Sequence, residues 1–492
     1  MIFIPQVKQK PMSLKTKNLT LIFSALWVCV AIFAICQTNL RANDVASAIG
    51  AGLLLLSSLF YARYILSVPI ASAPLIYLSI LGLFHLGLIL PWALGIYDIS
   101  RTPFFNPYGL SHAIALIDYS IVAFHIGIIV ALSRKKHTFL FSKSGTDTED
   151  KNVYVGGCIL LSAGISLFIV GLIGLDPLGY FRLTYSETYR LRAESDPRLF
   201  GSGMTVAFIG LSIAAAGASR RRFRVVSIIG AVWLVSLMYL GFRGPTVIAA
   251  LIVYVIARKK GLRISPLASL AAATLLLVIL PLLHESRELP LNERLAHISL
   301  NDFNILDAPA EMGMSVRPLV ETVDLLGPND FRLGRTYWIA IKGIVPNLAL
   351  RWEASSTTSD VDLPPNHWIT ALVDPWTYKN NGGMGFSAIA EPYMNFGIPG
   401  VIVYFFVLSF FLIYLEQISI RNAYALAAWA LILGPLLWTT RNDFTNFFRP
   451  AVWGLLTLAA VKLFAEGYSK FFKKWNPRPS KLDPTLVRAN HV

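Results

Sequence analysis

Long apolar runs separated by short polar segments dominate the chain. A helix needs about 20 apolar residues to cross the hydrocarbon core of a bilayer, and the pattern predicts about twelve such spans, the eighth of them short. These lie at roughly 19–37, 45–66, 73–95, 113–133, 154–174, 202–218, 225–241, 245–257, 266–283, 387–415, 423–439 and 448–465. The pattern therefore predicts an all-α polytopic membrane protein.

A polar stretch at about 284–383 separates the ninth and tenth spans. Helical periodicity appears inside it at 317–326 and 335–345, and several prolines interrupt it. Loops of this length without structure of their own are uncommon, so we expect a folded cap. No linker or low-complexity segment divides the chain, which predicts a single membrane domain, 1–492, that includes this large loop and a second loop at 175–201.

Charge predicts the orientation of the spans. Only 14% of the 492 residues are charged, against about 25% in soluble domains, yet the net charge is +15. Basic residues cluster in alternate short loops: Lys15, Lys17, Arg134, Lys135, Lys136, Arg220, Arg221, Arg222, Arg224, Arg258, Lys259, Lys260, Lys470, Lys473 and Lys474. The positive-inside rule places these loops and both termini in the cytoplasm and the large loop outside. Because the clusters flank spans, no nucleic-acid partner is predicted.

Arginine is abundant in the outside loops, where the same rule predicts few basic residues. These arginines are Arg182, Arg190, Arg192, Arg198, Arg243, Arg287, Arg294, Arg317, Arg332, Arg335, Arg351, Arg441 and Arg449. The planar guanidinium binds phosphate with two parallel hydrogen bonds and keeps its charge. The excess therefore indicates a phosphorylated lipid headgroup or an anionic sugar. The alternative is that each arginine pairs with a local acid or reaches up to lipid headgroups.

Four of the outside arginines are the best candidates for an anion site. Arg243 lies in a tight turn, 241–244, between two spans, with no acid nearby in the sequence, and Arg287 follows the ninth span. Arg190 and Arg192 lie beside Tyr189 in a segment rich in tyrosine. Aromatic rings stack on sugars but also form belts at the membrane interface, so both interpretations of the tyrosines stay open.

Two residues are candidates for a general base. His367 lies in the later part of the large loop, and a histidine that titrates near neutral pH can take a proton from a sugar hydroxyl. Glu391 opens the tenth span, where a carboxylate is costly unless it is used or paired, although a helix start also favours an acid. The sequence leaves the choice open. An Asp-Val-Asp at 360–362 matches a metal-binding pattern that is common by chance, so neither metal nor cofactor is predicted.

Three ordered motifs suggest a family. GFRGP at 241–245, GRTYW followed by IVPN within 334–347, and GMGFSAIAEPYMNFGIPG at 383–400 resemble the bacterial O-antigen polymerases, also called oligosaccharide repeat unit polymerases (Wzy). The motifs cover about 241–401, and the number of spans and the position of the large loop extend the resemblance to the whole chain.

The resemblance implies a glycosyltransferase of the multi-span, lipid-sugar-using (GT-C) class in the bacterial inner membrane. Such an enzyme works at the periplasmic face on undecaprenyl-pyrophosphate-linked repeat units. It transfers the growing chain from its lipid carrier to the non-reducing-end hydroxyl of a new unit and releases undecaprenyl pyrophosphate. The expected partners are these lipid-linked glycans, membrane lipid, a chain-length regulator and a flippase.

The candidate residues fit roles in such a reaction. Arg243 and Arg287 are expected to contact the pyrophosphate, with Arg190, Arg192 and Arg441 in support, because fixed arginines stabilise the charge that a departing pyrophosphate gains. His367 or Glu391 would then activate the acceptor hydroxyl.

Two other functions remain as alternatives. An O-antigen ligase carries out the same chemistry with a lipid A core acceptor, and the ordered motif at 383–400 favours the polymerase. A polysaccharide flippase or other transporter needs ionisable residues along its spans. Here they concentrate in outside loops, and the chain has no internal repeat.

Overall fold

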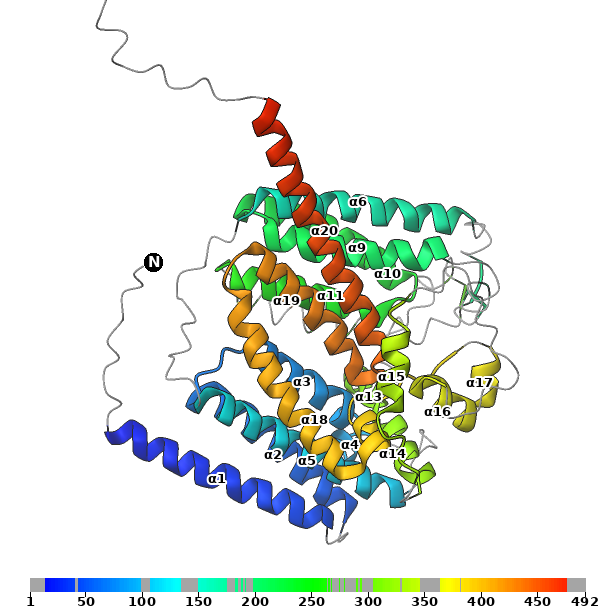
Figure 1. The fold of residues 1–492 in the computed structure, drawn as a ribbon. Helices are drawn as coiled ribbons and strands as arrows, with labels where there is room; N and C mark the ends of the chain where they lie inside the picture. The colour runs from blue at the N-terminus through cyan, green and yellow to red at the C-terminus, as the bar shows by residue number, and fades with distance from the viewer. Residues whose placement is uncertain are drawn as a thin grey trace, which may run out of the picture.

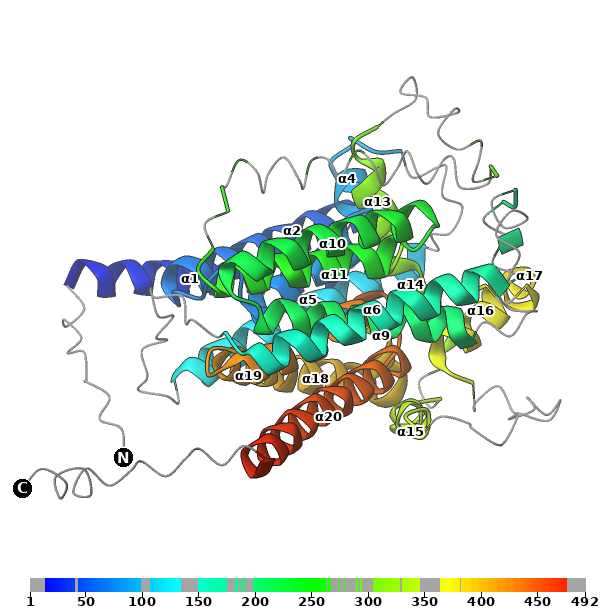
Figure 2. The ribbon, with the colours of Figure 1, turned by 90° about the horizontal axis from the view of Figure 1, so that it is seen from above.

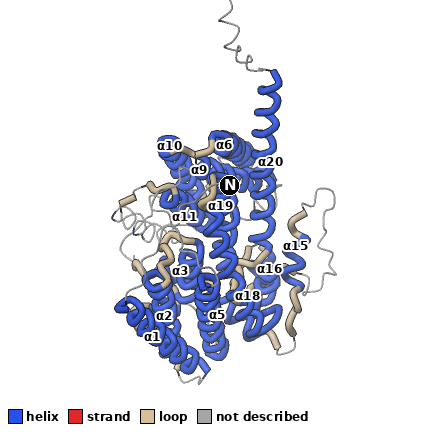
Figure 3. Tube along the Cα trace, turned by 60° about the vertical axis from the view of Figure 1, so that its left-hand side comes forward, coloured by secondary structure: helices blue, strands red, loops and turns tan. Residues whose placement is uncertain are grey.

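The protein is all helical throughout the part of the chain that the structure describes. This computed structural model describes residues 14–39, 43–98, 107–133, 149–174, 182–184, 187–188, 191, 198–262, 264–265, 267, 274, 278, 289–290, 293, 304–327, 330–345, 363–380 and 382–475. Within those ranges there is no strand, as Figure 3 shows.

The helices follow one another along the chain with short connections in many places. Their order is α1 (Leu14–Asn39), α2 (Asp44–Phe60), η1 (Tyr61–Ile65), α3 (Ala73–Leu86), α4 (Ile89–Ala93), α5 (Pro107–Ser133), α6 (Lys151–Gly174), α9 (Arg198–Gly217), α10 (Arg220–Tyr239), α11 (Arg243–Lys259), α13 (Asp307–Gly313), α14 (Val316–Leu325), α15 (Arg335–Lys342), α16 (Pro365–Val373), α17 (Pro375–Lys379), α18 (Ala390–Ser419), α19 (Ala423–Trp438), η5 (Thr439–Arg441) and α20 (Thr445–Trp475).

Eight helical segments in the described residues are long and apolar enough to cross a membrane. They are Asp44–Ile65, Gly109–Ser133, Lys151–Gly174, Leu199–Gly217, Arg220–Tyr239, Ala390–Ser419, Ala423–Arg441 and Thr445–Gly467. Each coincides with a span predicted from the sequence. The prediction of a polytopic all-α membrane protein is confirmed.

The predicted number of twelve spans is not reached among these residues. The described apolar part of α1 is Ile22–Cys36, and α11 has 17 residues, so both are shorter than the other spans. The ninth predicted span, 266–283, lies almost entirely outside the described residues. Twelve therefore stays a prediction.

The third predicted span, 73–95, is broken into α3 and α4, and the expectation of one continuous span is wrong there. Pro91 lacks the N–H that would bond back to the carbonyl of Gly87. Gly87 also lies against α13 of the large loop, because a Cβ at this position would be 2.4 Å from the carbonyl oxygen of Pro309. Helix α13 therefore packs against the bundle at this break.

Helices α6 and α9 form the closest pair in the bundle (Figures 1 and 2). Glycine recurs every seven residues along both of them: Gly157, Gly164 and Gly171 on α6, and Gly203, Gly210 and Gly217 on α9. A Cβ at Gly210 would lie 2.2 Å from the amide nitrogen of Leu161, so the two backbones touch directly. Small residues allow such close approach between membrane helices. The predicted loop 175–201 connects these two helices, and its last four residues, 198–201, belong to α9.

Helix α18 is interrupted near its start. Gly397 has φ 64° and ψ −155°, which breaks the helix, and Pro399 follows. The break frees carbonyl groups of the preceding turn, and these accept hydrogen bonds from the large loop. The N–H of Arg332 donates to the Met394 oxygen at 3.0 Å, and that of Leu333 donates to the Asn395 oxygen at 3.0 Å. The large loop is therefore joined to the start of α18 backbone to backbone.

The large loop folds into five short helices, α13 to α17, in the described residues, and α14 and α15 lie where the sequence predicts them. These cap helices gather at one end of the bundle, on the right in Figures 1 and 2. Helix α11 begins at this end, where Arg243 contacts Glu311 of α13. Its 17 residues extend about 25 Å toward the opposite end. The cap end and the basic end are the names used below for these two ends.

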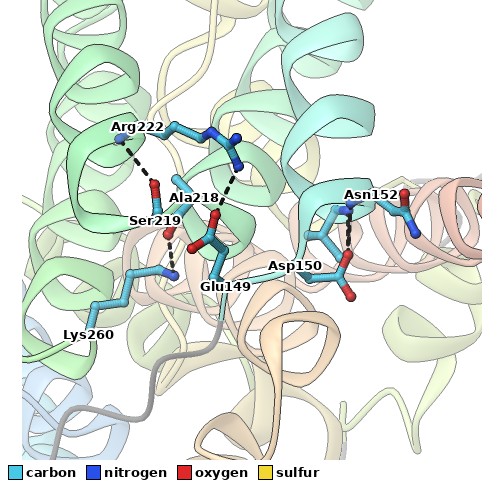
Figure 4. A network of polar contacts seen from close by, with 8 residues as sticks. Glu149, Asp150, Asn152, Ala218, Ser219, Arg222 and Lys260 are labelled. Atoms are coloured by element: carbon cyan, nitrogen blue, oxygen red, sulfur yellow. Dashed lines mark hydrogen bonds and ion pairs between the residues drawn. The ribbon is translucent and has the colours of Figure 1, made fainter.

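Polar contacts tie the helices together at the basic end. Arg222 at the start of α10 pairs with Glu149 at 2.9 Å, and Lys260 donates to the Ala218 carbonyl at 2.8 Å (Figure 4). Deeper in the bundle, the ammonium of Lys259 pairs with the buried carboxylate of Glu416. The basic loops at 220–224 and 258–260 thus share the end of the bundle away from the cap, as the predicted topology requires.

Candidate functional site

Arg243 is the first residue of α11 and stands at the cap end. Its guanidinium binds the carboxylate of Glu311 in a two-pronged ion pair: Nη2 lies 3.1 Å from Oε1, and Nη1 donates to Oε2 at 3.3 Å. Glu311 belongs to α13, 68 residues further along the chain. The sequence shows no acid near Arg243, and only the fold supplies one. The arginine fork therefore already holds a planar anion.

Arg441 lies close to the same place. Its guanidinium carbon is 5.6 Å from the centre of the Trp438 ring and 5.7 Å from that of Phe84. Gly244, next to Arg243, packs on the same tryptophan, because a Cβ there would be 2.3 Å from the indole. Trp438 thus lies against Arg441 and against the residue that follows Arg243.

The other predicted ligands cannot be placed. Arg190, Arg192, Tyr189 and Arg287 lie outside the described residues, as does the Asp-Val-Asp at 360–362. Their roles stay predictions. In the part of the chain with described positions, no group of three or more His, Cys, Asp or Glu side chains could hold a metal ion.

Glu391 is buried, with 2% of its surface exposed. Both carboxylate oxygens accept hydrogen bonds: Oε1 from the Thr336 hydroxyl at 2.8 Å and Oε2 from the Phe444 N–H at 2.8 Å. Thr336 lies in α15 of the cap, and Phe444 precedes α20. The carboxylate therefore joins α18 to the cap and to the last span. A buried polar group is tolerated when its oxygens have hydrogen-bond partners, as both oxygens of Glu391 do here.

Asn395 extends this network one helical turn further. Its Nδ2 donates to the Thr336 hydroxyl at 2.7 Å and to the Glu391 carbonyl at 2.8 Å, and its Oδ1 accepts the Gly334 N–H at 2.9 Å. Gly334 has φ 87°, a conformation that favours glycine. Two of the sequence motifs, at 334–338 and 383–400, thus meet in a single hydrogen-bonded cluster.

Tyr337 borders the same cluster from α15. Its ring lies edge-on to Phe444, with the centres 5.1 Å apart. Burial, together with the negative charge of Glu391, raises the pKa of the Tyr337 phenol. The phenol therefore stays neutral at physiological pH and adds no charge to the cluster.

The glycine-rich run before Glu391 is packed against the turn that carries Arg441. Gly385 has φ 77°, and a Cβ there would lie 2.6 Å from the Arg441 carbonyl oxygen. The next residue, Phe386, donates its N–H to that oxygen at 2.9 Å. Ser387 accepts the N–H groups of Ile389 and Ala390 at 3.1 and 3.2 Å and so caps the start of α18. The motif therefore fixes the position of Arg441.

His367 is exposed on α16, which distinguishes it from Glu391. Its ring faces the edge of Tyr378, 6.1 Å away between centres. Helix α16 is held by Asp443, a buried residue whose Oδ2 accepts the Asn366 N–H at 3.1 Å. Asp443 also accepts the N–H of Thr445 at the start of α20. One carboxylate thus fastens the helix that bears His367 to the last span.

Other cap arginines are held by local acids or rings. The Nε of Arg317 lies 3.6 Å from Glu321, and burial lowers the pKa of that arginine while it raises the pKa of Glu321. The guanidinium of Arg332 lies over Trp368, 4.7 Å from its ring centre. For Arg317 the structure shows the local acid that the sequence kept as the alternative, whereas Arg332 stacks on an aromatic ring of the cap.

Several residues of this region were missed by reasoning from the sequence: Glu311, Thr336, Asn395 and Asp443. The four-residue spacing of Glu391 and Asn395 places them on the same face of a helix, and that signal was available. The pairing of Arg243 with Glu311 had no local signal.

Comparison with known proteins identifies the family. The model of the O-antigen polysaccharide polymerase Wzy family matches residues 19–474, nearly the whole chain. The protein belongs to this family. No curated protein and no solved structure shows a match. The resemblance seen in the motifs is confirmed, and the protein is a multi-pass O-antigen polymerase that acts on lipid-linked oligosaccharide repeat units in the membrane.

Proposed function

We propose that polymerisation takes place at the cap end, on the periplasmic side of the bacterial inner membrane, with both termini in the cytoplasm. The growing glycan leaves undecaprenyl pyrophosphate and joins the non-reducing-end hydroxyl of the incoming repeat unit. In support, α11 has Arg243 at its cap end and Lys259 at its basic end. Short basic loops favour the cytoplasm, which leaves the cap outside.

The observation that carries this proposal is the fork of Arg243 at the start of a 17-residue helix. Helix N-termini and arginines both favour anions, and the fork already binds a carboxylate in the geometry that a phosphate would adopt. We therefore assign Arg243 to bind the pyrophosphate of the lipid-linked glycan donor. Arg441 lies over Trp438, against which Gly244 also packs, and adds positive charge to the same region.

The chemistry demands stabilisation of the leaving group. When the anomeric C–O bond breaks, its electrons go to the pyrophosphate, which gains negative charge. Fixed cationic donors aimed at that charge lower the barrier. We assign this role to Arg243 and Arg441, with Arg287, Arg190, Arg192 and Tyr189 contributed by the loops. The arginines take the role that a metal ion has in other glycosyltransferases, so the proposed mechanism is metal-independent.

His367 is our choice for the base that takes the proton of the acceptor hydroxyl. Its imidazole is exposed on the cap, where a sugar can approach it. Glu391 is buried, and both of its oxygens accept hydrogen bonds, from Thr336 of α15 and from Phe444 just before α20. A base must reach the proton that it abstracts, and Glu391 is enclosed. We therefore assign Glu391 a positioning role.

A lipopolysaccharide gel of a deletion strain tests the proposed function. A polymerase deletion should leave core carrying a single repeat unit, and the plasmid-borne gene should restore the ladder. Bare core without any repeat unit would instead indicate a ligase or a flippase. Complementation with Arg243→Lys or His367→Ala should return only the single-repeat band, with protein levels unchanged in the membrane fraction.

The proposal also places two partners beside the enzyme. A flippase must deliver repeat units to the periplasmic face, and a chain-length regulator must contact the membrane bundle or the cap. Site-specific photocrosslinkers on the exposed faces of α16 and α20 would capture a regulator if it docks there. Crosslinks that persist in a strain without the regulator would contradict the assignment.

A further inference from the structure

Glu311 is the anion that Arg243 holds in this structure. The pair is only partly buried, with 16% of the arginine side chain and 32% of the glutamate side chain exposed. The carboxylate comes from the cap and the guanidinium from a membrane helix, so the two charges belong to elements that meet only in the folded protein. A bidentate carboxylate occupies the same two N–H donors that a phosphate oxygen pair would use.

Backbone contacts hold α13 in place, whereas the side chain of Glu311 on this helix is partly exposed to solvent. Helix α13 packs backbone to backbone on the break between α3 and α4: a Cβ at Gly313 would be 2.0 Å from the amide nitrogen of Leu88. Pro309 makes the matching contact with Gly87. Rotation of the Glu311 side chain about its own bonds can therefore release Arg243 without any displacement of α13.

We propose that Glu311 is an exchangeable counter-ion of the donor site. It pairs with Arg243 while the site is empty, gives way to the pyrophosphate of the lipid-linked donor, and returns when undecaprenyl pyrophosphate leaves. This inference rests on the proposed function, which assigns Arg243 to the pyrophosphate. The exchange breaks one ion pair and forms another, and no covalent bond changes.

Such a counter-ion promotes the release of the product, undecaprenyl pyrophosphate. The free pyrophosphate product carries more negative charge than the glycosylated donor, so fixed arginines hold the product more strongly than the substrate. A carboxylate that competes for the fork weakens the binding of every anion there and offsets part of the cost of losing the product.

Removal of the carboxylate should therefore tighten anion binding. Glu311→Gln keeps the shape of the side chain and removes its charge. Because ion pairs with partial exposure are weak, the dissociation constant for undecaprenyl pyrophosphate should fall about two- to fivefold. Product inhibition should strengthen by the same factor, and kcat should not rise. If Glu311 only braced the cap, its loss would loosen Arg243 and weaken binding.

The test measures the binding of undecaprenyl pyrophosphate to the full-length protein in lipid nanodiscs by native mass spectrometry, with thermal unfolding recorded for each variant. Glu149→Gln is the matched control, since it removes the carboxylate of the Arg222 pair at the basic end. It should leave binding unchanged. Glu311→Asp keeps the charge on a shorter side chain and should lower the dissociation constant for undecaprenyl pyrophosphate by a smaller factor. It replaces Glu311→Gln in the test if that variant does not accumulate in the membrane.

The outcomes separate the inference from the function on which it rests. Tighter binding in Glu311→Gln, together with lost binding in Arg243→Gln, supports the exchange. Unchanged or weaker binding in both Glu311 variants, with Arg243→Gln still defective, overturns the exchange and leaves the donor assignment standing. Normal binding in Arg243→Gln refutes the donor assignment itself.

Discussion

Substitution of Glu391 separates a positioning carboxylate from a catalytic base. Glu391→Ala removes the acceptor of two donors, the Thr336 hydroxyl and the Phe444 N–H, in a site that is closed to solvent. Glu391→Gln keeps the shape and one carbonyl oxygen. That oxygen can face the Phe444 N–H, while the new NH₂ group donates to the Thr336 hydroxyl, which already accepts a hydrogen bond from Asn395.

The magnitudes follow from the groups left without partners. Each buried donor that loses its acceptor costs about 1–3 kcal/mol, so Glu391→Ala should destabilise the protein by about 2–6 kcal/mol. Glu391→Gln must only redirect the Thr336 hydroxyl proton, which amounts to about one hydrogen bond, or about 0.5–1.5 kcal/mol. A positioning role therefore predicts a graded loss of stability, with turnover by the folded Gln variant near that of the wild type.

Thermal unfolding in nanodiscs and turnover of synthetic lipid-linked repeat units give the two readouts. Asn395→Ala is a useful companion, because it breaks the same network without removing the carboxylate and should lower stability while sparing turnover. Loss of a general base costs about 100- to 10,000-fold in rate. A Glu391→Gln enzyme with an unchanged unfolding temperature and a rate more than 100-fold lower would refute the positioning role.

Four further outcomes are expected. Arg243→Lys should lower the polymerisation rate about 100- to 1000-fold, since one charge-assisted contact to a developing anion is worth about 3–4 kcal/mol; normal turnover would reduce Arg243 to a structural residue. His367→Ala should abolish chain growth while undecaprenyl pyrophosphate still binds, and growth that continues would remove it as the base. Gly210→Val should prevent accumulation of the protein, because its Cβ would meet the α6 backbone at 2.2 Å, whereas Gly201→Val, with no atom within 4 Å, should be tolerated. Reporter fusions after Lys136 should report cytoplasm, and one at Ser356 should report periplasm; a cytoplasmic Ser356 would overturn the orientation.

The spans could be read from the sequence because transfer of an apolar segment into lipid is a local property of that segment. The same holds for α14 and α15, whose periodic pattern is visible within the large loop. The break between α3 and α4 was not foreseen, although Gly87 and Pro91 were visible. A glycine and a proline permit a break in a helix. Only the tertiary structure shows that α13 packs against this break.

The chemical class of the substrate could be predicted from the sequence, but the contacts among the residues of the site could not. The excess of arginine in loops predicted to lie outside the membrane pointed to an anionic substrate, and in the structure Arg441 and Gly244, the residue after Arg243, both lie against Trp438. The sequence left His367 and Glu391 equal as bases. Their difference in exposure, which favours His367 in our proposal, arises because Thr336 of α15 and Phe444, just before α20, close over Glu391.

The sequence by itself determined that this chain is a multi-pass membrane protein with a folded loop, and its motifs identified the family. Hydropathy, charge bias and short motifs are carried by neighbouring residues, so they survive without knowledge of the fold. Only the tertiary structure decided that Glu311 pairs with Arg243 and that Glu391 and Asn395 bind Thr336. Those contacts join residues 55 to 68 positions apart, and which helix ends meet depends on the packing of the whole bundle.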